Sequence, residues 1–368
     1  MASLSFNKIL SKALETVTHG YLSFDAISSG VLRVDLGESA FGPSPKVLHK
    51  LKNLSQNISE YPIKQTVVLQ HALSKKFQIS RDQILISCGI DELISIIVHG
   101  CANSGDTAIA VVPTFYRLLE WSRLFGLNVL KIPLSLNDRF EFTEKVRDEL
   151  VIKSQKEHAK IILLCHPNNP AGTVVPLSYV ERIAQCLPQT WIVVDEAFYE
   201  CLGDEDRTSA ICLLKNLPNI IVLRNFSKSY GLASIRCGFL IGSAELVRNL
   251  TAIASPFAVS GISATLAVSA LSDKPYIRSV ATRTRTLRNE FIKSIASFSH
   301  IEVGSDSQTN MLLLRHTSKD LFIELKKCKI LAADFRDIEG LEGLGFVRIT
   351  IQRKEKNQRI ISALRKIN

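Results

Sequence analysis

The stretch Arg224-Asn225-Phe226-Ser227-Lys228-Ser229-Tyr230-Gly231-Leu232, residues 224–232, follows directly on an apolar, β-branched run at 219–224. Such a run predicts a buried strand, so Lys228 is expected just beyond its carboxyl end. A lysine on an exposed loop is the simpler alternative. However, Ser227 precedes Lys228 and Arg236 lies eight residues further on, so two side chains that can bind phosphate flank one amine. A desolvated lysine beside cations has a lowered pKa and can form a Schiff base.

Runs of the same kind recur from about residue 80 to 245. Segments with the period of an amphipathic helix lie between most of them, for example at 180–187. Continuous apolar strands that alternate with helices predict an α/β fold with a mainly parallel, seven-stranded sheet covered on both faces. Ligands of such sheets bind beyond the carboxyl ends of the strands. The predicted strands are 84–88, 107–112, 128–133, 160–165, 191–195, 219–224 and 237–241.

The rest of the chain divides into two pieces, residues 1–45 and residues 251–368. The second piece contains helical segments and two further apolar runs, at 311–315 and 346–351. We expect the two pieces to pack together as a smaller α/β domain beside a large domain of residues 46–250.

The composition is that of an ordinary globular protein. Of the 368 residues, 46% are hydrophobic and 22% are charged, and no apolar run approaches the roughly 18 residues that span a bilayer. Residues 1–16 alternate apolar and charged side chains too closely for a signal peptide. The eight cysteines form no C-x-x-C pair, so we expect reduced core residues and no metal site. These features predict a cytoplasmic protein without a membrane partner.

The net charge of +10 could indicate nucleic-acid binding. The basic residues are nevertheless spread along the whole chain, and their densest group, 353–366, has the spacing of a solvated amphipathic helix. No segment has the pattern of a DNA- or RNA-binding module. We therefore expect no nucleic-acid partner, and we attribute the charge to the attraction of anionic small molecules, including a phosphorylated cofactor.

Three further segments place polar groups or free backbone groups at the ends of predicted strands. Asp195 ends the run 191–195, where burial of a carboxylate is unfavourable unless it has a partner. Asp195 could instead cap a helix. Gly89 precedes a helix, and free N–H groups at a helix start can bind anions. The stretch 166–172 follows the run 160–165 and, rich in Asn, Pro and Gly, reads by itself as a turn.

The segment 227–236 resembles the S-K-x(7)-R lysine motif of fold-type I enzymes that use pyridoxal 5′-phosphate (PLP), the aspartate aminotransferase superfamily of class I and II. Within it, the chain is most similar to histidinol-phosphate aminotransferases and threonine-phosphate decarboxylases. The resemblance covers roughly residues 30 to 365, with the motifs in the expected order. It implies the fold-type I architecture, with PLP held as a Schiff base on Lys228 and its phosphate bound by Ser227 and Arg236.

The resemblance also implies contacts to the cofactor ring. Asp195 would face the pyridine nitrogen and keep it protonated, so that the ring acts as an electron sink. Asn169 belongs to a stretch that resembles N-P-N-N-P-x-G and would hydrogen-bond the phenolic oxygen of the cofactor. Phe115 would stack on the ring. Phe198 stands where the family's D-E-A-Y motif has tyrosine, so a phenol that normally hydrogen-bonds the cofactor is missing; Tyr199 follows it.

At the phosphate, the resemblance implies binding by the backbone of Gly89 and Ile90, with Asp91 as a helix cap. Tyr61, in Glu60-Tyr61-Pro62, matches a tyrosine that reaches the phosphate of the neighbouring subunit in relatives. The resemblance therefore implies a homodimer with shared active sites.

Arg348 fits the family's substrate-anion arginine and Arg336 a second one, since guanidinium binds carboxylate or phosphate bidentately. Either could instead be a surface ion pair. In residues 37–42, Ser39 replaces the Asn of the family's N-E-N-P-x-G, and Ala40 replaces its Pro; we expect Ser39 at the substrate. Leu118 stands where a second aromatic residue is usual.

These departures fall where the substrate and the reaction type are decided. The principal hypothesis is an aminotransferase of the histidinol-phosphate aminotransferase type, acting on an amino acid or amine, with Lys228 as general base and acid. The alternative is a PLP-dependent lyase, decarboxylase or cyclase of biosynthetic metabolism. It would act on a hydroxylated arginine-like or phosphorylated amino acid through the same Schiff base at Lys228. A PLP-binding regulator, a third hypothesis, would require sequence-specific DNA binding.

Overall fold

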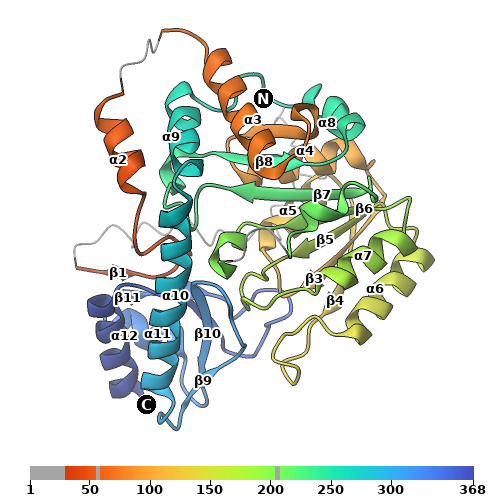
Figure 1. Cartoon of the computed structure of the whole chain (residues 1–368). Helices are drawn as coiled ribbons and strands as arrows, with labels where there is room; N and C mark the ends of the chain where they lie inside the picture. Colours follow the sequence, from red (N-terminus) through yellow and green to blue (C-terminus); the bar gives the residue numbers. More distant parts are fainter. Residues whose placement is uncertain (1–29, 55–58, 204–207) are drawn as a thin grey trace, which may run out of the picture.

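A seven-stranded sheet forms the centre of the larger part of the molecule, at the upper right of Figure 1, and a second, four-stranded sheet lies at the lower left. The computed structural model describes residues 30–54, 59–203 and 208–368. In the large sheet the strand order is β2-β8-β7-β6-β5-β3-β4. Its strands are β2 (Ile84–Ser87), β3 (Thr107–Val112), β4 (Asn128–Pro133), β5 (Ile161–Cys165), β6 (Trp191–Asp195), β7 (Ile220–Asn225) and β8 (Gly238–Ile241).

All seven predicted strands are confirmed to within one residue at each end. The pairs β3–β4, β3–β5, β5–β6 and β6–β7 are parallel, whereas β8 runs antiparallel to both β2 and β7. The α/β fold class with a mainly parallel sheet is therefore confirmed, with one reversed strand inside it.

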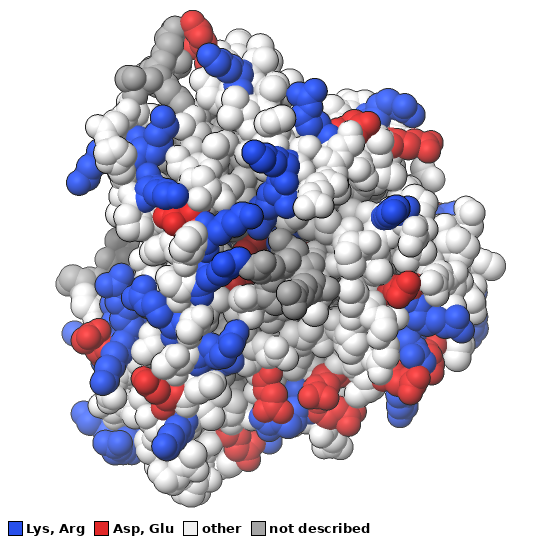
Figure 2. Space-filling model, in the orientation of Figure 1, with Lys and Arg blue, Asp and Glu red and all other residues white. Residues whose placement is uncertain are grey.

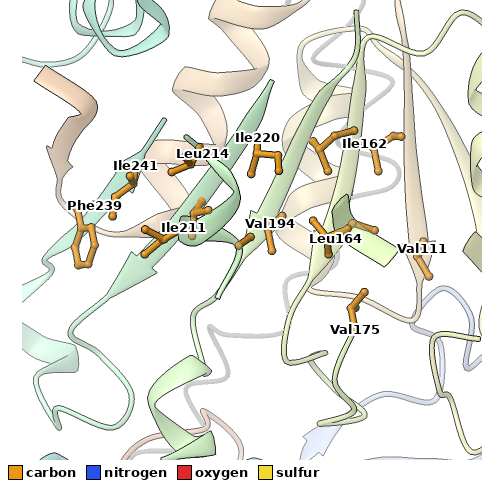
Figure 3. Packing of buried hydrophobic residues seen from close by; sticks show 14 of the residues in the cluster. Val111, Ile162, Leu164, Val175, Val194, Ile211, Leu214, Ile220, Phe239 and Ile241 are labelled. Atoms are coloured by element: carbon orange, nitrogen blue, oxygen red, sulfur yellow. The ribbon is translucent and has the colours of Figure 1, made fainter. Parts of the chain in front are cut away.

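Successive residues of a strand point to opposite faces of the sheet, and both faces are buried. In β5, Ile162 and Leu164 pack into one hydrophobic cluster, part of which is drawn in Figure 3. Ile161 and Leu163 pack into another. This is why the strands read as continuous apolar runs. Helices α3 (Ile63–Phe77), α6 (Glu144–Lys156), α7 (Leu177–Cys186) and α9 (Gly261–Leu271) contribute to the first cluster. Helices α4 (Ile90–Cys101), α5 (Tyr116–Leu124) and α8 (Ala244–Thr251) contribute to the second.

The small sheet is antiparallel, in the order β12-β13-β10-β9. A separate two-stranded parallel ladder joins β1, near the start of the described chain, to β11. A third hydrophobic cluster lies among these strands and the C-terminal helices. The elements are β1 (Leu32–Arg33), β9 (Ile301–Val303), β10 (Met311–His316), β11 (Ile330–Leu331), β12 (Ala333–Asp334), β13 (Val347–Thr350), α10 (Lys274–Ile295), α11 (Leu321–Lys327) and α12 (Lys354–Ile367).

Helix α2 (Pro45–Lys52) and four short 3₁₀ turns complete the described elements. The turns are η2 (Arg81–Gln83), η3 (Tyr199–Leu202), η4 (Ala210–Leu213) and η5 (Ala233–Ile235). Helix α9 packs on α2 and α3, although it follows residue 250. The division into residues 46–250 and the two flanking pieces stays a prediction.

Lys and Arg side chains are spread over much of the face seen in Figure 2, interrupted by acidic groups along its lower edge. All eight cysteines are free thiols. Within the described ranges, no helix is long and apolar enough to cross a membrane, and no His, Cys, Asp and Glu side chains gather as metal ligands.

Candidate active site

A cavity of about 460 Å³ opens beyond the carboxyl ends of the central parallel strands. Its walls come from the loops after β3, β5, β6 and β7, from the starts of α4 and α5, from residues 36–38 and from β13. The predicted site residues that line it are Ile90, Asp91, Phe115, Asn169, Asp195, Phe198, Ser227, Lys228, Arg236 and Arg348.

Lys228 lies three residues beyond β7, with its amine inside the cavity. Its Nζ donates a hydrogen bond of 2.8 Å to the carbonyl oxygen of Leu36. Burial and the Arg348 guanidinium lower the pKa of the Lys228 amine to about 8, against the opposing influence of the Glu38 and Asp195 carboxylates. More of this amine is therefore neutral, and nucleophilic, near pH 7 than in an ordinary lysine.

Asp195, the last residue of β6, is 1% exposed. Burial is the main reason that the pKa of its carboxyl is raised to about 7. Among the residues that the structure describes, its side chain accepts one hydrogen bond, from the backbone N–H of Ala197 at 3.0 Å, and forms no ion pair. A buried carboxylate that accepts so few hydrogen bonds would be stabilised by a cationic ligand in the cavity.

The other end of the cavity has the features of an anion site. Gly89 immediately precedes α4, so backbone N–H groups at the helix start are free to bind an anion. Its φ of +121° is one that residues with a side chain rarely adopt, and a Cβ there would lie 2.7 Å from the Arg236 guanidinium. Ser227 and Arg236 line the same cavity. A glycine at this position thus keeps the space between backbone and guanidinium open.

Arg348 reaches the cavity from the small sheet. It is 2% exposed; its NH1 group donates to the side-chain oxygen of Asn169 at 2.5 Å, and its NH2 group donates to the carbonyl oxygen of Asp35. Its guanidinium carbon lies 4.9 Å from the centre of the Phe335 ring. A buried, oriented guanidinium at this place can bind a carboxylate or phosphate.

Aromatic side chains form part of the wall. The Lys228 amine lies 5.0 Å from the centre of the Phe198 ring. Tyr199 does not take the place of the missing phenol, since it lies outside the cavity lining. Its hydroxyl hydrogen-bonds Thr208 at 3.1 Å, and its ring lies 4.0 Å from the guanidinium carbon of Arg224. Phe115 lines the cavity at the start of α5.

Four predicted residues do not line this cavity, and one of them is Gly89, which directly precedes Ile90 of the lining. Tyr61 is 73% exposed and stacks on Phe257, with ring centres 4.6 Å apart. The Ser39 hydroxyl accepts a hydrogen bond from the Phe41 N–H at 3.3 Å. Arg336 is held by Asp334 and Asp320, outside the cavity lining.

Other charged side chains line the cavity that sequence reasoning did not assign to the site. Arg117 donates to both oxygens of Asp91, at 2.8 and 3.2 Å, and to Glu120 at 2.6 Å. Glu38 also contributes to the wall. The i, i+3 spacing of Arg117 and Glu120, which would favour a contact on a helix, was the signal that the sequence offered. Nothing in the sequence pairs Arg117 with Asp91, which lies 26 residues earlier.

The donor set fits PLP. The cavity combines a lysine amine of lowered pKa, a buried carboxylate that needs a cationic partner, and a glycine-opened anion site beside Arg236. These are the groups that a carbonyl, a pyridinium nitrogen and a phosphate require.

Comparison with known proteins is consistent with this geometry. The family model described as aminotransferase class I and II matches residues 29–364. The histidinol-phosphate aminotransferase of Brevibacillus brevis is 30% identical over 341 residues, covering 92% of this chain and 90% of the relative. That of Staphylococcus aureus strain MSSA476 is 29% identical over 347 residues, covering 92% and 91%.

Solved structures share the fold. Histidinol-phosphate aminotransferase from Sinorhizobium meliloti, in complex with pyridoxal-5′-phosphate, superposes with a TM-score of 0.85 at 22% identity, over 100% of both chains. L-threonine-O-3-phosphate decarboxylase from Porphyromonas gingivalis superposes with a TM-score of 0.78 at 21% identity, over 92% of this chain and 99% of the other. The fold-type I architecture is thereby confirmed.

Proposed function

The chain belongs to the aminotransferase class I and II family and is a PLP-dependent aminotransferase, and we propose how its own residues carry out the reaction and on which donor they act. The proposed donor is a phosphorylated amine of the histidinol phosphate type, and the acceptor is a 2-oxo acid. The assignment of roles to residues rests on one observation: Lys228, Asp195 and Arg348 line the same cavity. When bound, the cofactor supplies an electron-withdrawing ring that accepts the electrons of the broken Cα–H bond.

Lys228 would hold the cofactor through Nζ, and its amine would be free again once the substrate amine has taken its place. The released amine then removes the Cα proton as a general base and returns it as a general acid. Its pKa of about 8 supports both roles, because an amine that titrates near the working pH can take up and release a proton readily.

The remaining cofactor contacts follow from the cavity wall. Asp195 pairs with the protonated ring nitrogen. Ser227, Arg236 and the backbone N–H groups of Gly89 and Ile90 hold the phosphate. Asp91 does not cap α4 as predicted, because the N-cap is Gly89 and no side chain caps the helix start; Arg117 and the Trp121 ring nitrogen hold the Asp91 carboxylate instead.

Asn169 faces the phenolic oxygen of the cofactor, and Phe115 packs on its ring. Arg348 binds the substrate's anionic group, with Asn169 and the Asp35 carbonyl fixing its guanidinium. Phe198 contacts the cofactor without a hydrogen bond. Ser39 and Arg336 reach the substrate in this proposal only if the loops that hold them rearrange, since neither lines the cavity.

We also propose that the protein is a homodimer. Five large apolar side chains are exposed on α3 and beside it, and we call them the α3 apolar patch: Tyr61, Ile63, Val67, Val68 and Phe257. Exposed apolar patches of this kind mark interfaces, and a two-fold axis would bury the same patch on both copies. Tyr61 would then reach the phosphate of the neighbouring subunit. The free thiols support a reducing, cytoplasmic location.

The direct test mixes the PLP-loaded protein with histidinol phosphate, with and without 2-oxoglutarate, and analyses product masses. We expect glutamate only when the oxo acid is present, and none with Lys228→Ala. Threonine phosphate, ornithine, arginine and hydroxylated arginine complete the panel. Failure of all donors to yield glutamate would overturn the proposal.

A lyase, decarboxylase or cyclase reaction is the second candidate, and Phe198 is the observation that favours it. Its ring stands beside Lys228 where a phenol is usual, and Tyr199 is turned away from the cavity. This candidate would be supported over amino transfer if a product formed without any oxo acid and were lighter than the substrate by water or carbon dioxide.

A further inference from the structure

Arg224 and Glu196 form an ion pair that is entirely buried. Both side chains are 0% exposed, and Oε2 of Glu196 lies 2.7 Å from NH2 and 2.8 Å from Nε of Arg224. Neither residue lines the cavity. Glu196 directly follows Asp195, and Arg224 precedes Lys228 by four residues. The pair therefore links the two strand ends that carry the two reactive groups.

Further hydrogen bonds complete the pair. Glu196 accepts from the backbone N–H of Ala210 at 2.7 Å and from the Ser209 hydroxyl at 2.8 and 3.0 Å. Arg224 also donates to Ser209 at 2.9 Å and to Glu200 at 3.2 Å. The orientation of the Glu196 carboxylate is thus fixed from three directions.

Two aromatic rings flank the Arg224 guanidinium. The guanidinium carbon of Arg224 lies 4.0 Å from the centre of the Tyr199 ring and 5.3 Å from that of Phe77. Buried ion pairs generally contribute no more stability than well-packed hydrophobic side chains of similar volume. A contribution to stability therefore does not by itself explain why three ionisable groups lie together here: Arg224, Glu196 and Glu200.

Asp195 depends on this arrangement in two ways. Its carboxylate accepts the N–H of Ala197, so Glu196 lies in the middle of the turn that orients it. In addition, burial is the main cause of the raised pKa of Asp195, and the negative charge of Glu196 raises that pKa further. Arg224 compensates that charge from the neighbouring strand, where Asp195 pairs with Leu223.

We propose that Arg224 is a positioning residue of the active site, which holds Glu196 so that Asp195 stays oriented and ionised against the ring nitrogen of the cofactor. The inference rests on the proposed function for the role of Asp195. It assigns Arg224 no contact with substrate or cofactor.

The test uses the full chain loaded with PLP that carries ¹⁵N at the ring nitrogen, because the ¹⁵N resonance reports whether that nitrogen is protonated. In Arg224→Gln we expect the ring nitrogen to lose its proton at a lower pH than in the wild type. We expect kcat for amino transfer to fall about tenfold or more, with KM changed by less than about threefold, as for a group needed only in the transition state. Arg224→Lys keeps the charge, and we expect it to recover part of both signals.

Two further variants keep the test decisive. Glu196→Gln combined with Arg224→Gln removes both charges, so the ring-nitrogen titration should return toward that of the wild type, even if the single glutamine variant does not fold. Arg139→Gln breaks an exposed pair with Asp306 and should change neither signal.

An unchanged ¹⁵N titration and kcat in a folded Arg224→Gln protein would overturn the inference. So would a folded double variant whose ring nitrogen loses its proton at the same low pH as in Arg224→Gln. The ¹⁵N titration needs no amino transfer, so failure of the proposed reaction with every donor would leave this result readable.

Discussion

The Arg348 guanidinium donates to the side-chain oxygen of Asn169 across 2.5 Å, although 179 residues separate the two along the chain. Asn169 follows β5 of the large sheet, and Arg348 lies in β13 of the small one. The bond therefore joins the two sheets inside the cavity. It also couples the group proposed to bind the substrate anion to the group proposed to face the phenolic oxygen of the cofactor.

This coupling predicts the effect of Arg348→Lys. A lysine keeps the positive charge but lacks the planar, forked set of N–H donors with which a guanidinium binds the substrate anion, Asn169 and the Asp35 carbonyl. We expect kcat/KM for the donor to fall about 10- to 100-fold, the range of one lost charge-assisted hydrogen bond. Steady-state kinetics measure this.

The matched control is Arg336→Lys. Arg336 is tied to Asp334 and Asp320 outside the cavity, so kcat/KM should stay within about twofold of the wild type. A loss as large as that in the Arg348 variant would instead place Arg336 at the substrate during turnover.

Gly89→Ala should weaken cofactor binding. The added Cβ would lie 2.7 Å from the Arg236 guanidinium, in a backbone conformation that alanine rarely adopts. Arg236 must then move from its place beside the proposed phosphate site. We expect the Kd for PLP, measured by titration of the apoprotein, to rise about tenfold or more, as for one lost charge-assisted hydrogen bond.

The control variant Gly105→Ala distinguishes the effect of the steric clash with Arg236 from the effect of the strained backbone. Gly105 also has a positive φ, +93°, but a Cβ there would meet nothing within 4 Å. We expect a lower melting temperature with unchanged PLP affinity. Equal loss of affinity in the two variants would contradict the proposed phosphate site.

The raised pKa of Asp195 predicts a pH-dependent gain of stability in the apoprotein of Asp195→Asn. The pKa of its carboxyl is about 7 in the folded chain, against the ordinary value of 3.8 expected when the chain is unfolded. Between these values the folded state binds more protons, so Asp195 makes the wild-type free energy of unfolding fall as pH rises. The variant lacks that fall, and its melting temperature should exceed that of the wild type at pH 8.

At pH 4 the difference should shrink toward zero, because Asp195 is protonated in the folded state and is already partly protonated in the unfolded state. Calorimetry at both pH values tests this. Asp306→Asn, at a side chain that is 64% exposed, serves as the control and should show no such pH dependence. A variant less stable than the wild type at pH 8 would contradict the prediction.

The α3 apolar patch predicts the effect of Val67→Asp. Val67 is 46% exposed on α3, and burial of a carboxylate in the proposed interface is unfavourable without a partner. We expect sedimentation equilibrium to find a monomer. Ile152→Asp on α6 is the control, since Ile152 is 66% exposed and lies outside the patch; that variant should remain a dimer. A dimer in both variants would exclude this patch as the interface.

The large sheet and one edge of the cavity could be predicted from the sequence. Strands buried on both faces need continuous apolar residues, and such runs are visible without a structure. Lys228 and Asp195 could be placed together because both follow predicted parallel strands, and the carboxyl ends of parallel strands share one edge. The reversal of β8 was not visible, because apolar runs carry no information on strand direction.

Which polar side chains meet depends on how distant segments pack, and this was not visible in the sequence. Arg348 and Arg336 look alike as sequence, yet packing turns the first into the cavity and ties the second to Asp334. Likewise, Arg224 and Glu196 became visible as a pair only once β6 and β7 lay side by side. Hydrophobic periodicity reports burial locally, whereas the partner of a charged side chain depends on which distant segments the fold brings within hydrogen-bond reach.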